Sequence, residues 1–122
     1  MPVHLFVYGT LMRGECRQRH LAGEEFVGAA ETSPHYRLYD VGEYPALVAA
    51  DPGVSIAGEL WLVTDDTLRN LDDVEGVDEG LYERRVIWLQ PPYDRLRAVT
   101  YVYLPSVAGL PDLGASWRDP RL

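Results

Sequence analysis

A short stretch near the start of the sequence, "VYGTL", combines residue types that could bind a ligand. An apolar run ends at Tyr8, whose hydroxyl stands beside a glycine turn formed by Gly9, Thr10 and Leu11. In such a turn the N–H groups of residues 9 to 11 could converge into a small nest that binds an anion. The same residues also suit a plain strand exit in which Gly9 supplies a positive φ, and the residues alone leave both interpretations open.

Glu75 is the carboxyl group best placed for proton transfer. The segment 64–76 predicts a helix, and Glu75 falls in its last turn. The partial negative charge at a helix C-terminus disfavours another carboxylate, and so do the neighbouring Asp72 and Asp73, so we expect a raised pKa. A raised pKa suits a group that takes and returns a proton near neutral pH. Because Glu75 follows Leu71 by one helical step, we also expect it to face inward.

Other kinds of catalytic centre find little support in the sequence. Cys16 has no C-x-x-C partner, and no serine stands in a G-x-S-x-G setting. The glycine turn lacks the spacing of a P-loop. The histidines also lack metal-binding spacing: His4, His20 and His35. We therefore expect neither a metal site nor a covalent nucleophile supplied by the protein.

Length and charge narrow the class of protein further. The chain has 122 residues, which fits a single domain over residues 1–122. Its formal net charge of −8 repels phosphate backbones and anionic membrane surfaces, so we expect neither nucleic acid nor a membrane as partner. No apolar stretch approaches the ~20 residues that span a bilayer, and the N-terminus does not resemble a signal peptide. We expect a cytoplasmic protein that is a monomer or a weak dimer.

Seven short runs separated by glycine, proline or aspartate predict the strands that position these residues. They cover residues 3–8, 24–31, 36–41, 45–50, 54–63, 82–89 and 96–104. The first run is apolar on both alternating faces, which is typical of a buried strand, and it leads directly to the glycine turn. Beyond Leu104 the chain is rich in proline and glycine, and we expect it to wrap the surface.

The predicted helix over 64–76 has recognisable ends. Thr64 or Asp65 can serve as the N-cap, and Gly76 is well placed to end the helix. A shorter helix is predicted over 15–23. One apolar stripe recurs at three-residue spacing: Leu68, Leu71 and Val74. Together these elements predict an α+β fold, with a small mixed β-barrel of about six or seven short strands and one or two flanking helices.

Several of these stretches, taken in order, resemble the gamma-glutamylcyclotransferase-like family, and most closely its gamma-glutamylamine cyclotransferase branch. The first, fourth and fifth of them together are fairly specific. The matching stretches are "VYGTLMRGE" at the N-terminus, "YPALV" at 44–48, "GELWLV" at 58–63, "LDDVEG" at 71–76, "YERRVI" at 82–87 and "SWRD" at 116–119.

The resemblance implies a cofactor-free enzyme with a compact β-barrel. Members convert a γ-glutamyl amine or amide into 5-oxoproline and the free amine, by attack of the substrate's own α-amine on its γ-carbonyl. The family's catalytic glutamate falls on Glu75, which would shuttle the proton. The remaining matches imply substrate-binding roles, chiefly through the backbone of the turn: Tyr8, Gly9, Thr10, Leu11 and Tyr82.

Some alternatives stay open at this point. One is a non-enzymatic module on the same scaffold that binds a small molecule or another protein. Val74 leaves room for it, because many family members carry an aromatic residue at this position beside Glu75. An amide hydrolase in which Glu75 activates water is another. The residues decide neither the identity of the leaving amine nor whether the nest binds the α-carboxylate or the oxyanion.

Overall fold

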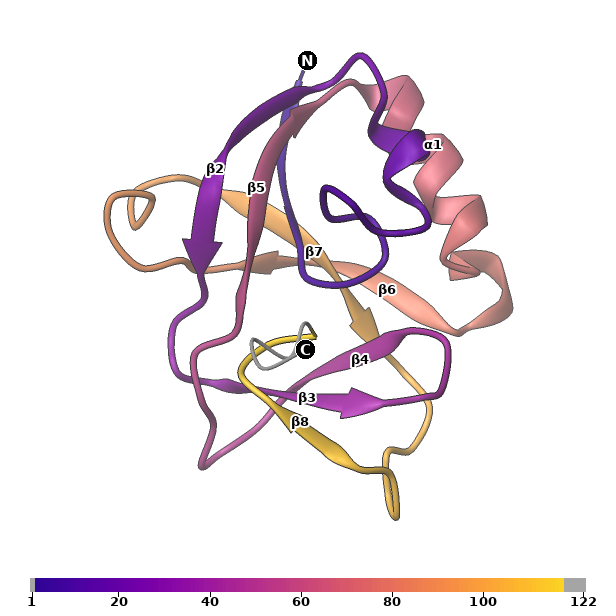
Figure 1. Cartoon of the computed structure of the whole chain (residues 1–122), viewed down its shortest axis with the longest axis vertical. Coiled ribbons are helices and arrows are strands. Elements are labelled where there is room, and N and C mark those ends of the chain that lie inside the picture. The colour runs from indigo at the N-terminus through magenta and orange to yellow at the C-terminus, as the bar shows by residue number, and fades with distance from the viewer. Residues whose placement is uncertain (1, 118–122) are drawn as a thin grey trace.

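The computed structural model describes residues 2–117, and within them eight strands form two sheets (Figure 1). The larger sheet has the order β2-β5-β1-β7-β6, and the smaller has the order β4-β3-β8. The strands are β1 (Val3–Val7), β2 (Glu25–Glu31), β3 (Tyr36–Asp40), β4 (Pro45–Ala49), β5 (Ala57–Val63), β6 (Tyr82–Ile87), β7 (Ala98–Tyr103) and β8 (Asp112–Gly114). Seven of them correspond to the predicted runs.

The central position of β1 explains why apolar side chains lie on both of its alternating faces. This strand lies antiparallel to β5 and parallel to β7, so the sheet is mixed, as predicted. Its residues Leu5 and Val7 belong to one buried cluster of side chains, and Phe6 and Tyr8 belong to a second cluster. Both faces of the strand are therefore covered, and its apolar side chains are removed from water on both sides.

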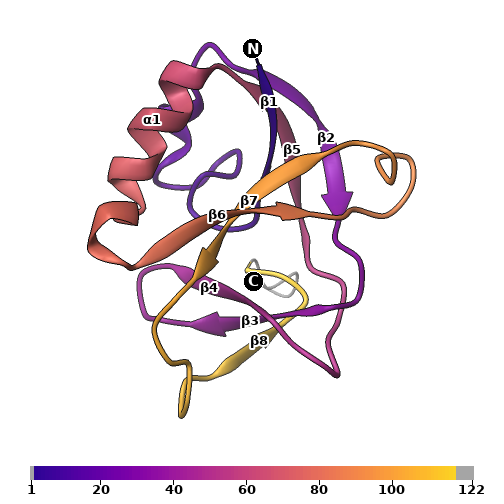
Figure 2. The same cartoon turned by 180° about the vertical axis from the view of Figure 1, so that it is seen from behind.

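The predicted α+β class is confirmed, but the described strands form two separate sheets and not the small mixed β-barrel that the sequence predicts. The edge strands of the larger sheet, β2 and β6, approach each other just past their ends, in an isolated bridge between Thr32 and Leu89. Prolines at 34, 91 and 92 lie directly beyond this bridge. A proline has no N–H to donate, so the ladder cannot extend there. The chain instead turns away after Thr32 to form β3 (Figure 2).

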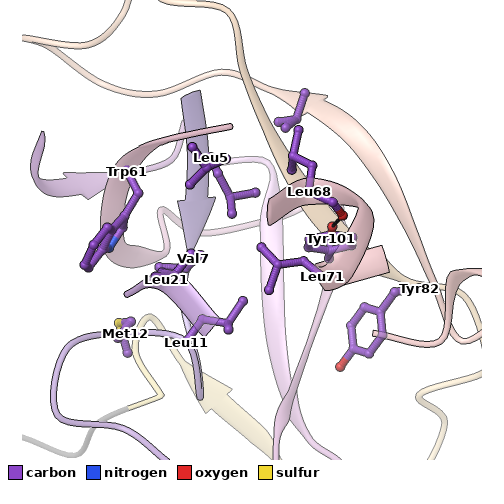
Figure 3. Close-up of a cluster of buried hydrophobic side chains, with 12 residues drawn as sticks. Leu5, Val7, Leu11, Met12, Leu21, Trp61, Leu68, Leu71, Tyr82 and Tyr101 are labelled. Atoms are coloured by element: carbon purple, nitrogen blue, oxygen red, sulfur yellow. Dashed lines mark hydrogen bonds between the residues drawn. The ribbon is translucent and has the colours of Figure 1, made fainter. Parts of the chain in front are cut away.

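The main helix forms where the sequence predicts it. Helix α1 spans Asp65–Val74, and the Thr64 hydroxyl caps it by accepting a hydrogen bond from the Thr67 N–H at 3.3 Å. Leu68 and Leu71 are buried, and Figure 3 shows both projecting from α1 toward the side chains of β1. Gly76 follows the helix in the left-handed conformation, with φ 67°, which glycine adopts without strain. The apolar face of α1 therefore fixes the helix on the larger sheet.

Two further features of the fold differ from the sequence predictions. The predicted helix over 15–23 is reduced to one 3-10 turn, Gln18–Leu21. The surface segment beyond Leu104 contains β8, which pairs with β3 and extends the smaller sheet. Its three residues are Asp-Leu-Gly, and such a short run with poor strand formers gives no strand pattern. The "SWRD" stretch extends to residues 118 and 119, which lie outside the described residues.

Residues 2–117 contain neither a membrane-spanning helix nor a cluster of potential metal ligands. No helix there is long and apolar enough to span a membrane. No group of three or more His, Cys, Asp or Glu side chains lies close enough together in this part of the chain to hold a metal ion.

Candidate active site

A cavity opens where β1 ends, between the larger sheet, the start of β4 and the C-terminal end of α1. It encloses about 340 Å³, including its open mouth. All six residues that the sequence singled out line this one space: Tyr8, Gly9, Thr10, Leu11, Glu75 and Tyr82. The fold thus brings together a turn and a helix end that are more than sixty residues apart in the sequence.

Glu75 carries the carboxyl group of the cavity. It caps the C-terminus of α1, where its N–H donates to the Leu71 carbonyl at 2.8 Å. Its side chain is half-buried, and burial raises its pKa from 4.5 to about 7, against the opposing positive charge of Arg17. Desolvation disfavours the ionised form, so this carboxyl group is divided between its two protonation states near neutral pH. The predicted direction of the pKa shift is confirmed.

The leading cause of that shift differs from the prediction, which invoked the helix C-terminus together with Asp72 and Asp73. The carboxylate of Asp72 accepts a hydrogen bond from the Tyr101 hydroxyl at 2.7 Å and forms an ion pair with Arg84 at 2.9 Å. Its charge is therefore compensated on the side of α1 that faces β6 and β7. Asp73 is exposed to water, which screens its charge. Burial of Glu75 itself is the leading cause of its raised pKa.

Two tyrosine hydroxyls in the cavity donate hydrogen bonds to backbone carbonyls. The Tyr8 hydroxyl donates to the backbone carbonyl of Tyr101 at 2.5 Å, and the Tyr82 hydroxyl donates to that of Pro45 at 2.7 Å. Burial raises the pKa of both phenols, so both stay neutral at physiological pH. Each hydroxyl oxygen keeps its capacity to accept a hydrogen bond. These tyrosines therefore present acceptors to whatever occupies the cavity.

The turn after β1 presents donors. Within residues 2–117 the N–H groups of Gly9, Thr10 and Leu11 donate no hydrogen bond, whereas two carbonyls of the turn are used. The Gly9 carbonyl accepts from the Met12 N–H at 3.1 Å, and the Thr10 carbonyl accepts from the Arg17 N–H at 2.8 Å. Three adjacent N–H groups without a protein acceptor fit the anion-binding interpretation of the turn better than the plain strand exit.

Gly9 is required for close approach and not for a special backbone angle. It is absent from the glycines with positive φ. A Cβ atom at this position would lie 2.6 Å from Cγ and 2.7 Å from Cδ of Pro45. The expectation that Gly9 supplies a positive φ is therefore wrong. Its missing side chain is what allows the turn to lie against Pro45 on the cavity wall.

A buried glutamate that the sequence analysis did not single out holds the far end of the turn. Glu59 of β5 is 5% exposed, and its carboxylate accepts three hydrogen bonds. Two come from Arg13, from its backbone N–H at 2.9 Å and its Nε at 3.2 Å, and one comes from the Trp61 indole at 3.3 Å. The Arg13 guanidinium also lies over the Phe26 ring, 3.7 Å from its centre. Charge-assisted bonds of this kind fix the loop relative to the sheet.

Sequence reasoning also missed part of the cavity wall. Tyr44 and Pro45 line it from the start of β4, and Tyr101 lines it from β7. The stretch "YPALV" contained the first two, but no pattern within it connects them with Glu75. Such contacts arise only when strands distant in sequence become neighbours.

The chemical capacity of the site follows from this geometry. One carboxyl group can accept and return a proton near pH 7, and it faces a space rimmed by backbone donors on one side and hydroxyl acceptors on another. Such an arrangement can orient a small substrate that carries both an anionic group and an amine, and it can move a proton between two of the substrate's atoms.

Comparison with known proteins gives consistent results. The family model described as "Gamma-glutamyl cyclotransferase, AIG2-like" matches residues 5–119. A putative gamma-glutamylcyclotransferase of Vibrio cholerae is 45% identical over 73 residues, covering 60% of this chain and 62% of that protein. A gamma-glutamylaminecyclotransferase of Rattus norvegicus is 34% identical, covering 69% of this chain and 61% of that protein. In both cases the match spans less than two thirds of the relative's length.

A solved structure extends the likeness to the whole fold. The crystal structure of an AIG2-like protein from Mus musculus superposes with a TM-score of 0.84 at 28% identity. The superposition covers 98% of this chain and 92% of that one. The two-sheet arrangement is therefore shared over nearly the full length of both chains.

Proposed function

Because this chain belongs to the gamma-glutamyl cyclotransferase, AIG2-like family, we propose that it converts a γ-glutamyl amine or amide into 5-oxoproline and the free amine, with Glu75 as the proton shuttle. One observation carries the proposal: the carboxyl group with a pKa of about 7 shares a small cavity with the N–H groups of residues 9 to 11, which donate no hydrogen bond within residues 2–117. An acid–base group tuned to neutral pH and an anion site are what this cyclisation requires.

The reaction uses the substrate's own nucleophile. The α-ammonium loses one proton to Glu75, and the resulting amine attacks the γ-carbonyl carbon, forming the new C–N bond of a five-membered ring. Glu75 passes this proton to the amide nitrogen and takes the second proton from the ring nitrogen. The tetrahedral intermediate then collapses, the original C–N bond breaks, and Glu75 gives its proton to the departing amine. Because both reacting groups lie in one molecule, holding them in attack geometry can contribute about 7–11 kcal/mol. The protein therefore needs no covalent nucleophile of its own.

The other lining residues bind and orient the substrate in this proposal. The N–H groups of Gly9, Thr10 and Leu11 are suited to the α-carboxylate or to the developing oxyanion, since both are anions within reach of a nest. The hydroxyl oxygens of Tyr8 and Tyr82 are acceptors, which suits a substrate amine that arrives protonated. The aromatic ring of Tyr82 also closes one wall of the cavity.

The test is a product assay on purified protein with a panel of γ-glutamyl amides, including γ-glutamyl-ε-lysine. Mass spectrometry should detect 5-oxoproline together with the free amine. Release of free glutamate would instead indicate hydrolysis by a water molecule that Glu75 activates. If no member of a broad panel is converted, the proposed activity is wrong. The alternative of a non-enzymatic binding module is not favoured, since the related proteins are named as cyclotransferases.

The pH dependence of the reaction provides a separate prediction. The free enzyme must carry ionised Glu75 to accept the proton, and the ionised fraction increases as pH rises through the pKa of about 7. We therefore expect kcat/KM to rise between pH 5.5 and 7.5 with an acid limb near pH 7, measured as release of 5-oxoproline. An acid limb near 4.5, the ordinary value of a glutamate, would show that the base is not buried and would contradict the assignment.

A further inference from the structure

The exposure of the lining residues shows where the cavity opens to solvent. Among residues 2–117 eleven line the cavity, and nine of these are buried. The two half-buried ones are Tyr44 and Glu75, so these are the lining residues that reach the protein surface. The mouth of the cavity therefore lies at Tyr44 and Glu75, and any part of a bound molecule that extends out of the cavity passes these two side chains.

The volume of the cavity limits how much of a substrate it can hold. About 340 Å³, which includes the open mouth, is near the lower end of the range of about 300–1,000 Å³ for small-molecule sites. In the proposed reaction the buried N–H groups of the turn bind an anionic part of the reacting glutamyl group, and Glu75 reaches the nitrogen of the departing amine. The glutamyl group thus lies inside the cavity, and the substituent of the amine extends outward past Tyr44.

The ring of Tyr44 is held in place by its neighbours. Its centre lies 6.1 Å from the centre of the Tyr82 ring, with the two planes tilted by 58°. Tyr82 in turn packs edge-to-face on Tyr103 at 5.3 Å, and its hydroxyl donates to the carbonyl of Pro45, the residue after Tyr44. The Tyr44 carbonyl accepts a hydrogen bond from the Val41 N–H at 3.1 Å, which fixes its backbone. A ring held in this way loses little conformational entropy when a ligand packs on it.

The ring, and not the hydroxyl, is the part of Tyr44 that these contacts orient. Within residues 2–117 the Tyr44 hydroxyl makes no hydrogen bond, whereas the hydroxyls of Tyr8 and Tyr82 both donate to backbone carbonyls. An aromatic ring offers a large apolar surface, and hydrocarbon that packs on it is removed from water. Tyr44 is therefore suited to bind carbon atoms at the mouth of the cavity.

We infer that the Tyr44 ring binds the hydrocarbon stem of the leaving amine, so that this protein prefers γ-glutamyl amides of amines with a chain of several carbons over those of methylamine. The inference rests on the proposed cyclotransferase function and specifies how the same site selects its substrate. The stem contacts the ring both before and during the reaction, because it lies outside the reacting bonds. Binding of this kind lowers KM and leaves kcat nearly unchanged.

The test compares two substrates that differ only in the length of this stem: γ-glutamylmethylamide and γ-glutamylbutylamide. The two amines are almost equally basic, so the chemical step should be the same for both. Each of the three additional methylene groups should contribute about twofold, which is half of the effect of complete burial on the free-energy scale. The wild-type protein should therefore have a kcat/KM about eightfold higher for the butylamide, mainly through KM, measured as release of 5-oxoproline.

Variants of Tyr44 show whether its ring is the cause. In Tyr44→Ala the ratio of the two kcat/KM values should fall to about one. Tyr44→Gln keeps more of the side-chain bulk beside Tyr82 and should also give a ratio near one, so it serves if the alanine variant does not fold. Tyr44→Phe should keep the wild-type ratio, because it keeps the ring and loses only the hydroxyl. Tyr39→Ala is the matched control, since Tyr39 is a half-buried tyrosine of the preceding strand, β3, that does not line the cavity.

The outcomes also separate this inference from the function on which it rests. Equal kcat/KM for the two substrates in the wild type overturns the role of Tyr44 while the cyclotransferase function stands. So does a Tyr44→Ala or Tyr44→Gln variant that loses activity equally on both substrates and keeps their ratio, because that pattern indicates a merely structural residue. If the wild-type protein converts neither substrate and no other γ-glutamyl amide, the function itself fails.

Discussion

Replacing Glu75 by glutamine is expected to lower kcat by about 10² to 10⁴ while the protein remains folded. Glutamine has nearly the same shape but can neither accept the proton of the α-ammonium nor return it to the leaving amine, and a positioned acid–base group contributes about this factor. The measurement is steady-state release of 5-oxoproline, with circular dichroism to verify the fold. Glu79→Gln is a matched control, because Glu79 is an exposed carboxylate only four residues further along the chain.

The same variant should be more stable than the wild type at alkaline pH. The folded-state pKa of about 7 lies above the ordinary value of 4.5, so folding favours the protonated form of Glu75. Its contribution is therefore most favourable below pH 4.5 and is lost as pH rises through 7. Above pH 8 glutamine removes the cost of a buried charge, on the order of 1–3 kcal/mol, which denaturant titration can detect. Full activity in Glu75→Gln, or equal stability at both pH extremes, would contradict a buried proton shuttle.

Replacing Gly9 by alanine is expected to lower kcat/KM by about 10² and to destabilise the protein by about 1–3 kcal/mol. The new methyl group would lie well inside contact distance of the Pro45 ring, at 2.6 and 2.7 Å from two of its carbons. Pro45 has little room to move, because it is buried at the start of β4 and its carbonyl accepts the Tyr82 hydroxyl. The turn must shift instead, and its N–H groups shift with it.

A double-mutant cycle shows whether the clash is the cause. Pro45→Ala removes the two ring carbons that the new methyl group would meet, so Gly9→Ala combined with Pro45→Ala should be more stable and more active than Gly9→Ala alone. Thermal unfolding and kcat/KM are measured for all four proteins of the cycle. Strictly additive effects would mean that Gly9 matters for a reason other than its approach to Pro45.

The sequence was most informative where the pattern is local. The N-cap at Thr64 and the apolar spacing within α1 predicted the helix, and the apolar run predicted β1 as a buried strand. Both features depend on residues within a few positions of one another, where backbone geometry alone sets which side chains share a face. Tyr8 and Glu75 were singled out on the same basis, because each stands at the end of such an element.

The sequence could not show how the strands, helix and loops are arranged relative to one another in space. It did not show that the sheet stops short of a closed barrel, which depends on where β2 and β6 diverge in space. The sequence also provided no sign that Glu59 holds the loop after the glycine turn. Within a strand, a buried glutamate and an exposed one produce the same alternating pattern. Here Glu59 is 5% exposed and accepts a hydrogen bond from the Arg13 N–H.

The cavity is the clearest case of a feature decided by tertiary structure. By itself the sequence determined the local elements and, through its resemblance to a family, named Glu75 and the turn at 8–11. Only the folded chain decided that these residues share one space with Tyr44 and Tyr101, and that burial, not the acidic neighbours, leads the rise in the pKa of Glu75. Desolvation depends on every atom that displaces water from the carboxyl group, and those atoms come from strands and turns that the linear sequence keeps far apart.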